Sequence, residues 1–150
     1  MKIKSRKLPV LLLLLLLSSS VFSQENDKQW EVWGKLTSID WEYKYSEMYK
    51  TEIGFPKFNK EVKDLDGKEV TIKGYVIPLE TEDNSIIISS LPYSSCFFCG
   101  GGGVETVMAV FPDEQRKYEL ETVTFKGVLE LNNGETGLIY NLKNAFEVEE

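Results

Sequence analysis

The chain has 150 residues, with 17 Lys and Arg residues against 24 Asp and Glu residues, and it contains no histidine. The formal net charge of −7 opposes nucleic-acid binding, which depends on cationic contacts with the phosphate backbone. The lack of histidine excludes an ordinary Ser-His-Asp triad. The length is enough for one domain with its own hydrophobic core.

Residues 1–23 have the pattern of a secretory signal peptide. A basic segment at 1–7 precedes an apolar run at 8–17, and small residues then lead to Ser23. Because the run is shorter than the roughly 20 apolar residues that span a bilayer, we expect cleavage before Gln24 and no membrane span afterwards. Residues 1–23 hold four cationic and no acidic residues, so the mature chain carries a net charge of −11. We expect a periplasmic or secreted protein.

Residues 24–60 form an extension rich in aromatic residues. Trp41, Tyr43 and Tyr45 alternate with polar residues, which is the period of a β-strand. Two interpretations are open. An exposed ladder of rings would stack on sugars or bases, whereas inward rings would cover the open side of the β-structure that follows. We favour an extension that packs on that structure.

Residues 61–150 are patterned as β-structure. Asp66-Gly67 and Asn133-Gly134 are turn signals. Gly74 lies within an alternating strand that Pro78 ends, and it indicates a bulge or a sharp bend. Gly127 lies within a second alternating strand, so we class Gly67, Gly74, Pro78 and Gly127 as structural. The expected strands cover residues 70–77, 86–88, 104–111, 123–131 and 138–142.

The fold class that these strands predict is all-β. Five strands with a bent first strand fit a small, partly open Greek-key barrel of the oligonucleotide/oligosaccharide-binding (OB) type at 61–150. A β-sandwich is the alternative. Helix is expected only as a turn or two near Ser46–Lys50 or Asp113–Tyr118.

Cys96-Phe97-Phe98-Cys99, followed by Gly100 to Gly103, is the candidate site, and it holds both cysteines of the chain. The first interpretation is a Cys96–Cys99 disulfide, because exported cysteines tend to oxidise. So short a loop removes little entropy from the unfolded chain, so stabilisation alone is a weak reason for such a bridge.

Two other interpretations of the cysteine pair stay open. A redox-active pair would need a lowered thiol pKa, as at a helix N-terminus, and the glycines disfavour a helix here. Cys96 and Cys99 would instead bind zinc or copper together with carboxylates, or across a symmetric dimer.

The N–H groups of Gly100, Gly101, Gly102 and Gly103 are candidates for an anion-binding nest. No Walker lysine follows them, so nucleotide binding is disfavoured.

Several of these features together resemble one bacterial family. They are the segment 65–79, which reads Leu-Asp-Gly-Lys through Gly-Tyr to Pro-Leu, the Pro56-x-Phe58 pair before it, and the Cys96/Cys99 motif with the apolar strand after it. The likeness covers about residues 55–140 and is to the exported family called domain of unknown function 3299. It implies architectural roles for Gly74 and Pro78, candidate functional roles for the cysteines, and a partner or cargo role beside an envelope transport system.

We therefore predict a non-enzymatic exported binding module of unknown ligand. Its Cys96–Cys99 loop would be a recognition element or a metal- or redox-sensitive element. The expected partner is an envelope protein, such as a transporter component, or a small ligand, and not nucleic acid. The alternative function is that of a periplasmic thiol–disulfide protein or a metallochaperone that uses the two cysteines.

Overall fold

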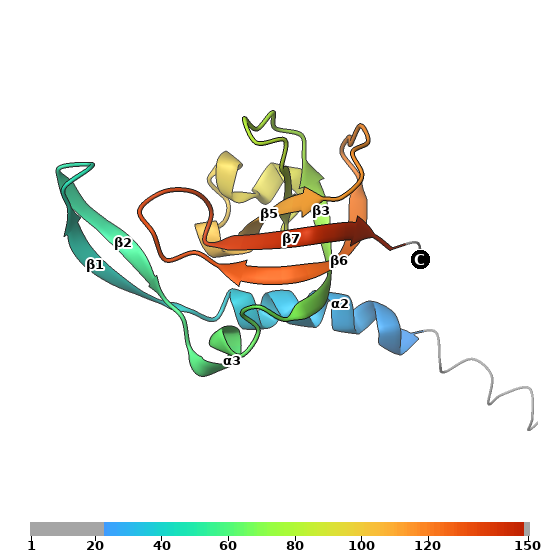
Figure 1. Ribbon diagram of the computed structural model, residues 1–150, viewed down its shortest axis with the longest axis horizontal. Helices are drawn as coiled ribbons and strands as arrows, with labels where there is room; N and C mark the ends of the chain where they lie inside the picture. The colour runs from blue at the N-terminus through green and yellow to red at the C-terminus, as the bar shows by residue number, and fades with distance from the viewer. Residues whose placement is uncertain (1–22, 149–150) are drawn as a thin grey trace, which may run out of the picture.

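The computed structural model describes residues 23–148, so residues 1–22 of the expected signal peptide lie outside the described residues. The elements surround one barrel, with helix α2 beneath it and a β-hairpin at one side (Figure 1). In chain order they are α2 (Ser23–Leu36), β1 (Asp40–Ser46), β2 (Thr51–Lys57), α3 (Lys60–Lys63), β3 (Glu69–Ile77), β4 (Ile86–Ser89), the 3₁₀ turns η1 (Tyr93–Ser95), η2 (Phe97–Cys99) and η3 (Val104–Thr106), β5 (Val107–Pro112), β6 (Thr122–Leu131) and β7 (Tyr140–Glu147).

One five-stranded sheet closes on itself in the order β3-β4-β5-β7-β6. Every neighbouring pair is antiparallel except β5 and β7, which run parallel. This is a small closed β-barrel, so the predicted fold class is confirmed and the alternative of a β-sandwich is wrong.

Helix α2 closes one end of the barrel and shares its core. Trp33 and Leu36 are buried in the same cluster as the inward side chains of the strands. The indole Nε1 of Trp33 donates a hydrogen bond of 2.7 Å to the carbonyl of Lys73 on β3. Phe58, which follows the hairpin, packs on Tyr140 with the ring centroids 5.9 Å apart. The N-terminal extension and the barrel therefore have one continuous core.

The expectation of almost no helix is wrong for this extension. Residues 23–36 are helical because Trp30, Trp33 and Leu36 recur every three residues, which places them on one face of a helix. That face packs against the core, with Trp33 and Leu36 buried and Trp30 partly buried. The second α-helix, α3, begins at the cap Asn59, whose side chain accepts a hydrogen bond from Val62 N. Residues 113–118, one of the two places where at most a turn or two of helix was expected, have none.

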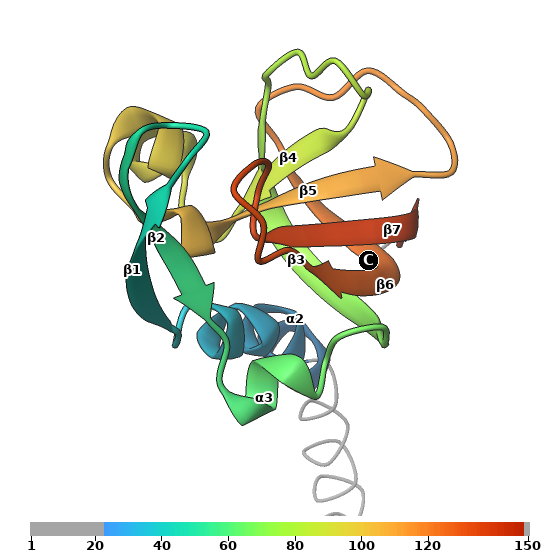
Figure 2. The same ribbon diagram turned by 60° about the vertical axis from the view of Figure 1, so that its left-hand side comes forward.

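The hairpin β1–β2 stands away from the barrel as a separate two-stranded ribbon (Figures 1 and 2). Trp41, at its base, packs against the core. The rings of Tyr43 and Tyr45, however, are 71% and 57% exposed. The expectation that the aromatic rings of residues 28–60 cover the β-structure is therefore confirmed for Trp30, Trp33, Trp41 and Phe58. It is wrong for Tyr43 and Tyr45.

The structural glycines lie where another residue would have a strained backbone or a side chain without space. Gly67 has a φ of 70° in the turn before β3, as its turn signal predicts. A Cβ on Gly74 would lie 3.0 Å from Ile88 Cβ. The register of β3 with β6 runs through Gly74 without a shift, so the position is a close approach to β4 and not a bulge. At Gly127 the register of β6 with β7 does shift. There a Cβ would lie 2.8 Å from the carbonyl oxygen of Lys143.

The remaining element boundaries differ by a few residues from those expected. Pairing of β3 ends at Ile77, just before Pro78, as predicted. Residues 104–106 form the turn η3, so the strand expected from 104 begins at Val107. Asn133-Gly134 lies in the longer loop 132–139 rather than in a tight hairpin turn. Within residues 23–148, none of the helices has the length and apolar character that a bilayer crossing requires.

Candidate functional site

Strands β4 and β5 are buried on both faces, which explains why their sequences are nearly continuous runs of apolar residues. Ile88 and Met108 point into the barrel core. Ile87 and Ala109 belong instead to a second, smaller cluster on the outer face of these strands. OB barrels use the outer face of their second and third strands to bind ligands, and here β4 and β5 are those strands.

The Cys/Gly loop, residues 90–106, covers this outer face. Cys96 is fully buried in the second cluster and packs among Ile77, Ile87 and Val107. It therefore behaves as a small apolar side chain that anchors the loop on the barrel. The face that other barrels of this kind present to ligands is occupied by the protein's own loop.

The backbone of the loop is held by its own hydrogen bonds. The carbonyl oxygen of Cys96 accepts from Cys99 N at 3.0 Å and from Gly101 N at 3.1 Å. Gly100 N donates to the carbonyl of Phe97 at 3.0 Å. Since Gly100 and Gly101 already donate within the loop, two of the four candidate N–H groups of an anion-binding nest are in use.

Backbone conformation explains one of the four consecutive glycines, and close packing explains two others. Gly100 has a φ of 78°, the left-handed conformation that ends the turn η2. A Cβ on Gly101 would overlap the carbonyl of Ser95, and one on Gly102 would lie 2.7 Å from Thr106 Oγ1. The glycines thus allow the loop to fold back on itself. They are required for its shape.

The two thiols are adjacent but unlike in their surroundings. Cys96 is buried and Cys99 is exposed, both are free, and their Sγ atoms are 3.8 Å apart. Desolvation by neighbouring atoms raises the pKa of the Cys99 thiol, and its contact with Cys96 raises that pKa further. Catalytic thiols have the opposite shift, because a nearby cation or a helix N-terminus stabilises the thiolate. The disulfide stays a prediction.

A metal ion at Cys96 and Cys99 would be bound by their two sulfur atoms. Within residues 23–148 no group of three or more Cys, His, Asp or Glu residues is placed to hold a metal ion. Structural zinc sites take four such ligands. Zinc or copper at Cys96 and Cys99 would therefore need further ligands from another molecule, and its binding stays a prediction.

The residues between the cysteines point outward. Phe97 and Phe98 are 37% and 47% exposed, and their rings meet edge to face with centroids 5.2 Å apart. Tyr93, on the turn η1, is also exposed. The loop therefore displays three aromatic rings at the surface. Sequence reasoning named this loop but did not single out these rings, although Phe97 and Phe98 stand between the two cysteines.

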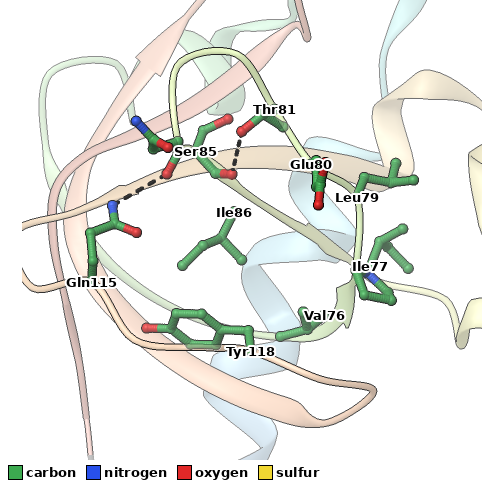
Figure 3. A pocket seen from close by; sticks show the side chains of 11 residues that line it. Val76, Ile77, Leu79, Glu80, Thr81, Ser85, Ile86, Gln115 and Tyr118 are labelled. Carbon is green, nitrogen blue, oxygen red and sulfur yellow. Dashed lines mark hydrogen bonds between the residues drawn. The ribbon is translucent and has the colours of Figure 1, made fainter.

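A pocket that the sequence did not indicate lies between the β3–β4 loop and the loop after β5 (Figure 3). Its volume is about 430 Å³. Gln115 Nε2 donates a hydrogen bond of 3.2 Å to the carbonyl of Asn84 and so joins the two loops. Thr81 Oγ1 donates to the carbonyl of Ser85 at 2.7 Å. The first bond thus joins the two loops, whereas the second lies within the β3–β4 loop. Glu80 is the charged residue among those that line the pocket.

Arg116 fixes the loop beside this pocket. Its guanidinium lies over the ring of Tyr118, 3.9 Å from the centroid, and makes ion pairs with Glu121 at 2.9 Å and Glu147 at 2.7 Å. Hydrogen bonds from Arg116 hold the pKa of both carboxyl groups below its usual value. The one positive charge of Arg116 faces two carboxylates, so the cluster has a net charge of −1. Its ion pairs hold this loop to Glu147 on β7 and to Glu121, which directly precedes β6.

Comparison with known proteins finds a similar solved structure. No protein-family model matches the chain, and no curated protein matches it. Among solved structures, a DUF3299 family protein from Pseudomonas aeruginosa PAO1 is similar, with 21% sequence identity and a TM-score of 0.45. The match covers 59% of this chain and 66% of that chain, just under two thirds of its length. The family named for that structure is the one that residues 55–140 of this sequence resemble.

Proposed function

We propose that the protein is an exported, non-enzymatic binding module whose Cys/Gly loop is the recognition element for a protein partner of the envelope. The observation that supports it is the opposite placement of neighbouring residues. Cys96 is fully buried, whereas Phe97 and Phe98 are exposed. A short loop that is anchored from within spends no binding energy on becoming ordered.

The chemistry of the loop suits a protein partner with an apolar pocket. Exposed aromatic rings are enriched in the cores of protein interfaces and among the residues that carry their binding energy. The edge-to-face contact of Phe97 with Phe98 keeps the two rings together as one unit. The loop 90–106 has Glu105 as its charged residue, so contact with it requires little desolvation of charge.

Photocrosslinking in the native envelope tests this function. A photoreactive phenylalanine analogue in place of Phe98 should give a discrete crosslinked species, while the same analogue at the exposed Lys117 should not. The substitution Phe97→Ser, made in the protein that carries the analogue at position 98, should abolish the crosslinked species without changing the melting temperature. Equal crosslinking from both positions, or from neither, would overturn the proposed function.

The alternative function, in thiol–disulfide exchange or metal transfer, is supported by the 3.8 Å separation of the two sulfur atoms. The raised pKa of Cys99 opposes it, because the thiolate is the reactive form. Titration of the reduced protein with Cu(I) or Zn²⁺, compared with Cys99→Ser, separates the two functions. Stoichiometric binding that the variant loses would favour the alternative.

A further inference from the structure

The outer edge of strand β1 has no partner among the strands described. β1 pairs with β2 alone, and the hairpin is not part of the barrel. In Figure 2, β1 forms the outer margin of this ribbon. A free edge presents unpaired N–H and C=O groups and is a template for pairing with another strand. The edge of β2 is weaker, because Pro56 lacks an N–H group and prolines in strands turn that side to solvent.

The charges of β1 are self-complementary. Glu42 and Lys44 lie on one face of the strand, with Tyr43 between them, and they form an ion pair of 2.9 Å. If two copies of β1 pair antiparallel about Tyr43, Glu42 of each copy lies opposite Lys44 of the other. Opposite charges at directly facing positions stabilise a strand pair, and like charges destabilise it.

The aromatic face of β1 is self-complementary about the same residue. In that register Tyr43 meets Tyr43 of the second copy, and Trp41 meets Tyr45. Facing aromatic side chains are among the favourable cross-strand pairs. A Cβ on Gly54 of β2 would lie 3.3 Å from the ring of Trp41 and 3.5 Å from that of Tyr43, so these rings lie over the bare backbone of the ribbon. Pairing would bury rings that a single chain leaves exposed.

We propose that the protein forms a two-fold dimer through antiparallel pairing of the β1 edges, centred on Tyr43. The register is determined by both faces. A shift by one residue places rings opposite charges, and a shift by two places Lys44 opposite Lys44 or Glu42 opposite Glu42. The occupant of the edge is a second copy of this chain, because both the charges and the rings match themselves. The two-fold makes one ribbon of four strands from the two hairpins.

Sedimentation velocity of the purified, host-processed protein from micromolar to submillimolar concentration tests the dimer. We expect a concentration-dependent dimer for the natural sequence. Lys44→Glu, and separately Glu42→Lys, should raise the dissociation constant about tenfold or more, because each places like charges opposite each other. The double variant Glu42→Lys/Lys44→Glu should restore dimerisation, since it again opposes unlike charges. Lys117→Glu makes the same charge change on the β5–β6 loop and should have no effect.

The charge swap keeps the test independent of hairpin folding. Both single variants also lose the ion pair within β1, whereas the double variant regains it in reverse. Circular dichroism should be the same for all forms, and so should the melting temperature at concentrations low enough that all of them are monomeric. A natural protein that is monomeric throughout, single variants that dimerise as tightly as it does, or a double variant that stays monomeric would each overturn the proposal.

Discussion

The hydroxyl of Tyr140 on β7 donates a hydrogen bond of 2.6 Å to the backbone carbonyl of Leu36, the last residue of α2. Both residues are fully buried. The last carbonyls of a helix have no partner within the helix, so one supplied by the barrel satisfies a group that would otherwise be buried unpaired. This bond joins the extension to the final strand and makes the helix part of the domain.

Removing that hydroxyl should destabilise the protein while leaving its packing intact. Tyr140→Phe keeps the ring but leaves the Leu36 carbonyl unpaired, at a cost of about 1–3 kcal/mol. Urea unfolding measures the change in the free energy of unfolding. Tyr49→Phe is the matched control, because the Tyr49 ring is exposed, and it should change stability by less than about 0.5 kcal/mol. Equal effects of the two substitutions would show that the buried bond contributes nothing.

The same tyrosine predicts a loss of stability at alkaline pH. Burial raises the pKa of Tyr140 well above its usual value of about 10, and Glu105 adds to the shift. Above pH 10 the unfolded chain therefore releases this proton while the folded protein retains it. Stability must then fall as the pH rises through this range. Urea unfolding between pH 8 and pH 11 should show a steeper decline for the natural protein than for Tyr140→Phe; parallel curves would contradict the assignment.

Two glycines should respond to substitution in opposite directions. Gly74→Val would force a side chain against Ile88, since even a Cβ would lie 3.0 Å from its Cβ, and we expect a loss of roughly 1–3 kcal/mol. Gly34 lies in α2 with nothing within 4 Å of an added Cβ. Gly34→Ala should therefore stabilise the protein by about 0.5–1 kcal/mol, because alanine favours the helix. Thermal unfolding of both variants measures these effects. A Gly74→Val protein as stable as the natural one would contradict the close approach of β3 to β4 at Gly74.

The barrel could be predicted from sequence because its signals are local. β3 and β6 alternate between buried and partly buried positions along most of their length, and the run Ile86–Ile88 indicates a strand that is buried on both faces. The turn at Gly67 follows from a single dipeptide. Helix α2 was missed although Trp30, Trp33 and Leu36 have helical spacing, because an aromatic-rich segment that ends in alternating rings also fits a strand.

The features that could not be predicted depend on distant contacts. The period of two along β1 shows that Tyr43 and Tyr45 share a face, but not that α2 has already taken the place they would cover. The motif at Cys96 and Cys99 shows two thiols close in sequence. Its asymmetry depends on Ile87 and neighbouring residues of β3 and β5, which meet Cys96 only after the barrel closes.

This asymmetry separates a packing role for the cysteines from a bridging role. In the reduced protein Cys96 lies among apolar side chains, whereas Cys99 is exposed. Cys96→Ser would place a polar hydroxyl in the apolar site that the sulfur now occupies. A buried hydroxyl without a hydrogen-bond partner costs about 1–3 kcal/mol. At position 99 the hydroxyl would reach water. A bridge, by contrast, is lost equally by either substitution.

Cys96→Ser should therefore lower the free energy of unfolding by about 1–3 kcal/mol in the presence of reductant, and Cys99→Ser by less than about 0.5 kcal/mol. Urea unfolding with and without reductant measures both roles at once. If oxidation forms the Cys96–Cys99 bridge, the natural protein alone should gain stability without reductant, by on the order of 2 kcal/mol, because the closed loop is short. Equal costs for the two serine variants under reducing conditions would mean that Cys96 does not anchor the loop, and the outward display of Phe97 and Phe98 would lose its structural basis.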